Sequence, residues 1–319
     1  LAFMKLYELY DIDLDGKVSA YIPSLRRSNK KQTSFKEVLS HSAGWLPYIA
    51  HQNFVRKKNG GFKKRTLQSQ KSKRFPTQIS DSLFLFGKYQ KKIMRRIRKT
   101  KMSTLGTYKY SGLWFFLIPE LTERLSGISF ESFLKKHFYD PLKLEQLTFL
   151  PSKRFPKQQI VPTEYDGDFR KQLVQGWVHD EAAALMGGIS GNAGLFSNAA
   201  SIAPILEMLL NNGNYRGKVY LRKETVTLFT QRAYPNGANR RGLGFDKPSV
   251  TENDVRYPSF LVSPSSYGHT GFTGTLIWID PEKKGFLIFL SNRVYPSRNQ
   301  RGLYDLNIRA QLLDHAFEN

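Results

Sequence analysis

A stretch rich in glycine and hydroxyl residues, residues 267–275 (YGHTGFTGT), carries side chains suited to chemistry on a ligand. Small residues at the start of a strand let a ligand lie against the strand's backbone. His269 and Thr270 stand in this stretch, where an imidazole and a hydroxyl would project toward that ligand. An imidazole changes its charge near neutral pH and can donate or accept a proton there. The stretch therefore predicts one wall of a binding or catalytic site.

The elements next to this stretch must hold it in place. Two apolar, aromatic-rich runs, residues 276–280 and 286–292, flank the turn at residues 281–285. Apolar runs separated by a turn with proline and glycine predict a β-hairpin that is buried on at least one face. We expect the strand that carries His269 to run directly into the first strand of this hairpin.

The order His269-Thr270-Gly271 resembles the third motif of the serine β-lactamase and penicillin-binding-protein superfamily. In that family a Lys-Thr-Gly or His-Thr-Gly strand forms one wall of the active site. The resemblance implies a catalytic role for His269 and substrate contacts for Thr270, Gly271 and Phe272. It also implies that the Phe272 N–H helps to hold the oxyanion. His269 would carry charge only when protonated, so recognition of carboxylates should be weak near neutral pH.

Residues 110–112 (YSG), followed by two helix-like segments, resemble the second motif of the same family. Tyr110 aligns with the family's catalytic tyrosine, and Ser111 falls at a substrate-binding position. Gly112 departs from the usual Asn or Asp, so a polar side chain that helps to hold the substrate or the lysine is absent.

Further segments extend the resemblance over nearly the whole chain. Residues 39–44 (LSHSAG) are similar to a loop of the class C β-lactamase and esterase branch. His41 in this loop is interpreted as a structural histidine rather than a catalyst. The chain looks especially like the domain found behind a family 3 glycoside hydrolase in Bacteroidetes-like proteins, so an upstream part of the polypeptide is an expected partner.

The family's nucleophile, the serine of Ser-x-x-Lys, has no convincing counterpart in this chain. Serine is a weak nucleophile until a neighbouring base removes its proton. Ser28-x-x-Lys31 lies in a polar connection, and Ser132-x-x-Lys135 lies after the tyrosine motif. Residues 1–10 favour a helix but have no capping residue before them. We therefore expect the chain to be truncated at its front end, with Ser-x-x-Lys upstream.

The charge of the chain is strongly and unevenly positive. It has 49 basic and 26 acidic residues among 319, a net charge of +23, and no cysteine, which excludes disulfides and thiol nucleophiles. Between residues 26 and 102 the acids are only Glu37 and Asp81. A field of this sign attracts polyanions. The alternative function is therefore a catalytically silent binding module for anionic envelope polymers or lipid headgroups; nucleic acid is not expected, since no nucleic-acid-binding motif accompanies the charge.

Helical spacing and apolar runs predict an α+β fold in a single domain, residues 1–319. Residues 1–210 should be mostly helical, with a basic insertion at 46–104, and residues 211–319 should carry an antiparallel sheet and a C-terminal helix. Within the insertion, apolar residues at helical spacing predict an amphipathic helix over residues 82–99. Its basic face is interpreted as exposed to solvent. The alternative is that this face contacts an anionic surface. Residues 303–317 are the expected C-terminal helix.

Neither a metal nor another cofactor is expected. Residues 11–16 (DIDLDG) imitate the front of a calcium loop, but Ile22 stands where the loop needs a glutamate. Residues 179–181 (HDE) have no second cluster of ligands. The resemblance implies instead a serine hydrolase that forms an acyl-enzyme with a peptidoglycan-related amide, ester or β-lactam. It also implies the periplasm or cell envelope, and a fragment that is silent without its nucleophile.

Overall fold

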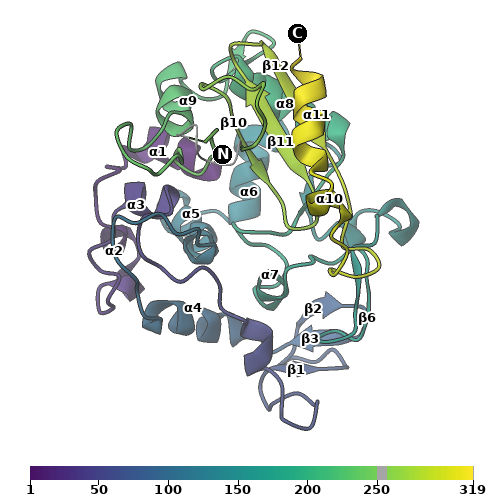
Figure 1. Ribbon diagram of the computed structural model, residues 1–319. Coiled ribbons are helices and arrows are strands. Elements are labelled where there is room, and N and C mark those ends of the chain that lie inside the picture. Colours follow the sequence, from purple (N-terminus) through teal and green to yellow (C-terminus); the bar gives the residue numbers. More distant parts are fainter. Residues whose placement is uncertain (250–256, 319) are drawn as a thin grey trace.

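Strands gather into small antiparallel sheets (Figure 1). The computed structural model describes residues 1–249 and 257–318. One sheet has the strand order β10 (Tyr267–Thr270), β11 (Leu276–Asp280), β12 (Gly285–Phe289), and another has the order β1 (Leu67–Gln68), β3 (Leu83–Leu85), β2 (Thr77–Ser80). The strand pairs are β4 (Thr148–Phe149) with β7 (Leu195–Phe196), β5 (Glu164–Asp166) with β6 (Gln172–Val174), and β8 (Asn214–Tyr215) with β9 (Lys218–Val219).

Helices fill the space between the two three-stranded sheets, which lie at opposite ends of the molecule (Figure 1). The α-helices are α1 (Ala2–Tyr10), α2 (Val18–Tyr21), α3 (Phe35–Leu39), α4 (Tyr89–Lys99), α5 (Ile118–Ser126), α6 (Phe130–Leu134), α7 (Glu181–Leu185), α8 (Ala199–Leu210), α9 (Lys223–Thr230), α10 (Gly302–Asp305) and α11 (Ile308–Ala316). Short 3₁₀ segments are η1 (Pro23–Leu25), η2 (His51–Phe54), η3 (Leu113–Leu117), η5 (Pro151–Lys153) and η6 (Lys157–Gln159), and η4 (Lys135–Tyr139) is a π-helical turn. Within the described ranges no helix is long and apolar enough to cross a membrane.

The β10–β11–β12 sheet is apolar on both faces because side chains alternate along its strands. Leu276 and Trp278 of β11 form a core cluster with residues of α11, so α11 covers that face. Ile277 and Ile279 point the other way into the main core, where α8 packs on β11 and β12. The hairpin predicted at residues 276–292 is confirmed, and the α+β class is confirmed with it.

The loop that carries His41 is set by a well-capped helix. The Ser34 hydroxyl accepts a hydrogen bond from the Glu37 N–H, and the Glu37 carboxylate accepts one from the Ser34 N–H. This reciprocal pair satisfies two donors that the first turn of α3 would otherwise leave free. The short helix ends at Leu39, and His41 follows in the left-handed region with a φ of 59°.

The basic insertion at residues 46–104 combines a small sheet with one α-helix. It contains the β1–β3–β2 sheet and α4, which buries Tyr89, Ile93 and Ile97. The predicted helix over residues 82–99 is wrong in its first turns, because Leu83–Leu85 forms β3 with its leucines on one buried face. Residues 1–210 contain more helix than strand, and the strands β1 to β7 among them are only two to four residues long.

Two further boundaries differ from the predicted ones. The C-terminal helix predicted at residues 303–317 is broken at Asn307, which has a φ of 51°, so that α10 and α11 are separate. The strand of His269 ends at Thr270, and a turn through Gly274, with a φ of 113°, separates β10 from β11.

Candidate active site

Side chains that are far apart in the sequence meet around the ring of Tyr110. Its ring centroid lies 4.4 Å from that of His41 and 6.2 Å from that of His269. The guanidinium carbon of Arg241 lies 5.7 Å from the same centroid. Tyr110 is 47% exposed, so the group has an open side. The structure therefore brings together Tyr110 and His269, the two residues that the sequence marks as catalytic candidates.

Ser111 fixes the segment that carries Tyr110. Its hydroxyl donates to the Leu46 carbonyl oxygen at 2.6 Å, and its N–H donates to Nδ1 of His41 at 3.2 Å. Since the hydroxyl hydrogen is engaged and the residue is buried, Ser111 could meet a substrate only as an acceptor. A Cβ placed on Gly112 would meet open space, so the position at which the family usually carries Asn or Asp is empty here.

His269 presents a neutral imidazole to the site. On β10 it lies opposite Ile277, which places it on the face of the sheet that meets the helical core. Its Nδ1 is 2.8 Å from the Thr270 carbonyl oxygen, so Nδ1 carries the proton and donates. Burial, and after it the charge of Arg241, lower the pKa of His269. At neutral pH its Nε2 is therefore a hydrogen-bond acceptor, whereas a lysine in its place would be a fixed cation.

A buried ion pair lies behind the two rings. Arg241 is 1% exposed, and its Nη1 is 3.2 Å from Oδ2 of Asp246. The same carboxylate accepts from Arg240 at 3.1 Å and from the Tyr257 hydroxyl at 2.7 Å. Burial opposes ionisation of Asp246, but Arg241 and Arg240 outweigh it and lower the pKa of this carboxyl. Sequence reasoning missed Arg241, which looks like one more surface cation in so basic a chain.

Asp246 also joins this ion pair to the strand of His269. Its backbone exchanges two hydrogen bonds with Gly268, at 2.8 and 3.0 Å. Residue 268 has to be glycine, because a Cβ there would lie 2.2 Å from the Ile277 carbonyl oxygen and 2.4 Å from the Trp278 ring. The small residue predicted to allow close approach therefore accommodates the protein's own backbone and ring.

His41 receives two donors but has one lone pair when neutral. The Ser111 N–H points at its Nδ1, and Nη2 of Arg241 lies 3.2 Å from its Nε2. A neutral imidazole can accept at only one of these nitrogens, and protonation would remove that acceptor as well. Burial, followed by Arg241 and His269, lowers the pKa of His41 to about 3. These contacts support the interpretation of His41 as a structural histidine that orients Tyr110.

A second buried histidine, His51, makes the fold sensitive to acid. It is fully buried against Phe54 and Phe116, and neither ring nitrogen has a hydrogen-bond partner within the described part of the chain. Burial, and then Arg96, lower its pKa to about 4. In the unfolded chain the imidazole takes up its proton near pH 6.5.

We therefore expect the contribution of His51 to stability to be full above pH 6.5 and to fall as the pH drops toward 4. His51 alone should account for a loss of about 3 kcal/mol in the free energy of unfolding across this window. Urea unfolding of His51→Leu at several pH values should show a flatter profile. The exposed His315 provides the control His315→Leu; an unchanged profile for His51→Leu would contradict this assignment.

Two arginines hold the turn that follows β10. Nη2 of Arg309, on α11, donates to the carbonyl oxygens of Gly271 at 2.7 Å and Thr275 at 3.1 Å. Nε of Arg293 donates to the Phe272 carbonyl oxygen at 3.0 Å. The Phe272 N–H itself has no acceptor in the described residues. The turn therefore presents a free donor, and its carbonyl groups are fixed from behind.

A buried ionic network supports the ring of Phe272. The ring stacks on His179 at 5.6 Å between centroids, and His179 pairs with Glu164 at 3.0 Å. Arg298 bridges Glu164 and Glu181 at 2.6 and 2.8 Å. Burial raises the pKa of Glu164, but hydrogen bonds from His179 and Arg298 outweigh this and lower it to about 2. Residues 179–181, weighed as metal ligands in the sequence, serve this network and the cap of α7.

The serines of the two Ser-x-x-Lys pairs, Ser28 and Ser132, each make a local hydrogen bond. The Ser28 hydroxyl donates to the Leu25 carbonyl oxygen in the turn after η1. Ser132 is exposed in the first turn of α6, where its hydroxyl accepts from Ser129. Both serines are engaged in local turn and cap contacts.

Comparison with known proteins decides the family. The profile described as "Beta-lactamase" matches residues 1–311. The chain belongs to the beta-lactamase family. This family comprises serine hydrolases, so the resemblance carried by the tyrosine and His-Thr-Gly motifs is confirmed at the level of the family.

Several relatives of this beta-lactamase-family chain carry the name of a carboxypeptidase. A protein of Escherichia coli strain K12 named "Putative D-alanyl-D-alanine carboxypeptidase" is 29% identical over 314 residues, which cover 92% of the chain and 65% of the relative. The chain thus spans slightly less than two thirds of that relative's length. Among solved structures, a penicillin-binding-protein homologue from Caulobacter crescentus has a TM-score of 0.59 at 15% identity, covering 91% of the chain and 74% of the homologue.

A fungal enzyme shares the fold as well. Simvastatin synthase from Aspergillus terreus has a TM-score of 0.59 at 17% identity, covering 97% of the chain and 81% of the enzyme. At such low identity these likenesses establish the fold of this family alone.

Proposed function

We propose that this chain supplies the tyrosine and histidine walls of a serine-hydrolase site that works through an acyl-enzyme. The observation that carries the proposal is that the ring centroids of Tyr110 and His269 lie 6.2 Å apart. The strand of His269 ends beside them, and the turn that follows it offers the free Phe272 N–H. Membership of a serine-hydrolase family supports it.

In the proposed reaction the serine oxygen attacks the acyl carbon while its proton passes to a base near Tyr110. The leaving group then takes a proton, and water hydrolyses the ester in a second step. The Phe272 N–H would donate to the oxyanion. In this chain burial raises the pKa of Tyr110, and Arg241 opposes that rise only in part. A lysine ammonium beside the phenol would lower this pKa, so a larger share of Tyr110 would be ionised and able to act as that base.

The proposed substrate is a peptidoglycan-related amide or ester, or a β-lactam, in the cell envelope. The name of the Escherichia coli relative supports this class. Because His269 is neutral at physiological pH and Arg241 is buried, the site offers little positive charge for a terminal carboxylate. We propose that an uncharged group on the carboxyl side of the scissile bond is accepted more readily than a free carboxylate.

We also propose that the nucleophile is not among these 319 residues, on the grounds of the positions of Ser28 and Ser132. A fluorophosphonate or labelled penicillin should leave the chain unlabelled. A polypeptide in which the Ser-x-x-Lys helix of a relative precedes Leu1 should become labelled on that serine. Labelling of the 319-residue chain would overturn the statement about the nucleophile, and a well-folded but unlabelled fusion would count against the hydrolase site.

The alternative is a binding module that uses its basic surface. On α4, Lys91, Arg95 and Lys99 are exposed at intervals of four residues and so form one stripe. By contrast, Arg96 bonds the Tyr89 hydroxyl and Arg98 bonds the Ser24 carbonyl oxygen, which gives these two structural roles. Polyanion affinity that falls with salt and is lost when the three stripe residues are changed to glutamine would favour this alternative.

A further inference from the structure

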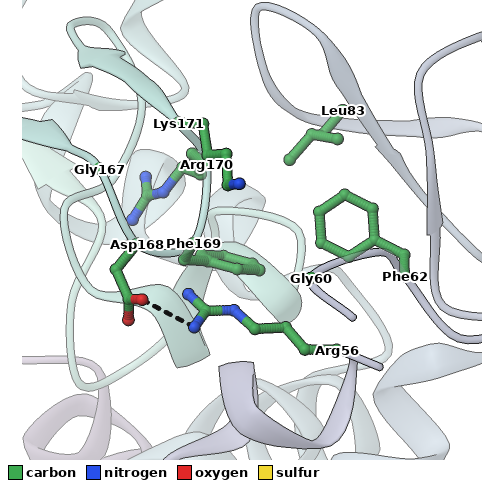
Figure 2. Close-up of a pocket in the computed structure, with 9 residues that line it drawn as sticks. All are labelled: Arg56, Gly60, Phe62, Leu83, Gly167, Asp168, Phe169, Arg170 and Lys171. Atoms are coloured by element: carbon green, nitrogen blue, oxygen red, sulfur yellow. Dashed lines mark hydrogen bonds and ion pairs between the residues drawn. The ribbon is translucent and has the colours of Figure 1, made fainter. Parts of the chain in front are cut away.

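A cavity of about 310 Å³ lies where the basic insertion meets the turn between β5 and β6 (Figure 2). Arg56, Phe62 and Leu83 line it from the insertion, and residues 167–171 line it from the turn. Its size falls at the lower end of the range of small-ligand pockets. It shares no lining residue with the group around Tyr110.

The lining combines positive charge with aromatic surface. Arg56, Arg170 and Lys171 are cationic, and Asp168 is the one carboxylate among the lining residues. In Figure 2 the Lys171 amine points into the space between Phe169 and the side chains of Leu83 and Phe62. A ligand there would meet cations on one side and apolar groups on the other.

The base of the cavity is held rigidly. Oδ1 of Asp166 accepts from the N–H groups of Asp168 and Phe169, and its Oδ2 pairs with the buried Arg170 at 3.1 Å. Arg170 also donates to the carbonyl oxygens of Val178 and His179. Because these groups are fixed before a ligand arrives, little ordering would be needed on binding.

Arg56 is held by a partner that is easily displaced. Its Nη1 lies 2.9 Å from Oδ1 of Asp168, whose side chain is 84% exposed (Figure 2). Its Nη2 is buried beside Phe169 with no hydrogen-bond acceptor in the part of the chain described. An ion pair whose carboxylate is this exposed is worth at most about 1 kcal/mol. An incoming oxyanion could therefore take the place of the aspartate at little cost.

We propose that this pocket is a binding site for a small oxyanion, a phosphate or carboxylate, attached to an apolar or aromatic group. The anion replaces the Asp168 carboxylate at the Arg56 guanidinium and contacts the Lys171 amine. The apolar group lies between Phe169 and Phe62. A planar guanidinium binds a phosphate and a carboxylate in the same way, through paired N–H donors. Experiment therefore has to decide which of the two oxyanions the ligand carries.

The test is calorimetric titration of the 319-residue chain, at low ionic strength, with phenyl phosphate, benzoate and inorganic phosphate. One molecule of phenyl phosphate or benzoate should bind per chain, and inorganic phosphate should bind more weakly because it lacks the ring. Preference for phenyl phosphate would assign a phosphate ester, and preference for benzoate a carboxylate.

Two variants should move the affinity in opposite directions. Arg56→Gln should lower it by about tenfold, as expected for one charge-assisted contact. Asp168→Asn should raise it, because the internal competitor is removed. The controls make the same charge changes on residues outside the pocket: Arg74→Gln, and Asp81→Asn, whose carboxylate pairs with Lys157.

Equal losses for Arg56→Gln and Arg74→Gln would show that the probes sense only the general positive field, and the proposal would fail. It would also fail if no probe bound, or if Asp168→Asn raised the affinity no more than Asp81→Asn does. A gain that is confined to Asp168→Asn would support the site even if Arg56→Gln proved too unstable to measure.

Discussion

Replacement of Tyr110 by phenylalanine is expected to slow acylation by about 10²–10⁴-fold in a polypeptide that joins this chain to a Ser-x-x-Lys helix. The change removes only the phenolic oxygen, so the ring contacts with His41 and His269 should persist. The rate of labelling by a fluorophosphonate, or of hydrolysis of a chromogenic ester, measures the effect.

Tyr108 provides a matched control for this experiment. It is also a half-exposed tyrosine, two residues away on the same segment, and its ring faces Arg240. Tyr108→Phe should leave the rate within about twofold, since no acid–base role is assigned to it. A Tyr110→Phe protein that acylates as fast as Tyr108→Phe would remove the phenol from the proposed mechanism.

Replacement of Asp246 by alanine is expected to lower the free energy of unfolding by about 3–5 kcal/mol. The change leaves Arg241 charged and buried without its carboxylate, and it also removes the acceptor of the Tyr257 hydroxyl. Removing one partner of a buried pair exposes the full desolvation cost of the other. Urea unfolding monitored by tryptophan fluorescence measures the loss.

An exposed ion pair of the same chemistry serves as the control. Asp305 pairs with Arg301 at 3.2 Å, and both side chains are more than half exposed. Asp305→Ala should cost at most about 1 kcal/mol. Similar losses for the two variants would mean that the Arg241–Asp246 pair stabilises the protein no more than an exposed pair does.

The sheet that carries His269 could be predicted because its signals are local. Apolar runs on either side of a proline- and glycine-containing turn define β11 and β12 without knowledge of the rest of the fold. The turn at residues 271–275 was not predicted. Its residues also suit a strand, but Gly271 and Gly274 close the turn with backbone hydrogen bonds. Arg309, which lies 34 or more positions away, holds its carbonyl groups, and local spacing does not reveal this contact.

In the insertion, the spacing of the apolar residues fits both a helix and a strand. Leu85, Tyr89, Ile93 and Ile97 recur every four residues, which favours one helix. Leu83 and Leu85 also alternate with Phe84, and pairing with β1 and β2 selects the strand. Such pairing is a tertiary effect that spacing alone does not contain.

The sequence motifs predict the residues of the candidate site, but they do not predict the residues that hold this site in place. The sequence resemblance placed Tyr110 and His269 in one site, and the structure puts their rings side by side. Arg241, Arg309 and Arg298 give no comparable signal, because 49 basic residues make any one arginine look like surface charge. Only the burial of these arginines and the groups that they contact in the fold distinguish them from surface arginines.

The most direct test of the proposed site is a crystal structure of the acylated fusion of this chain with a Ser-x-x-Lys helix. We expect the acyl carbonyl oxygen within about 3 Å of the Phe272 N–H, with the Tyr110 hydroxyl within hydrogen-bond reach of the serine oxygen. An adduct whose carbonyl oxygen points away from Phe272, or one formed on Ser28 or Ser132, would contradict it.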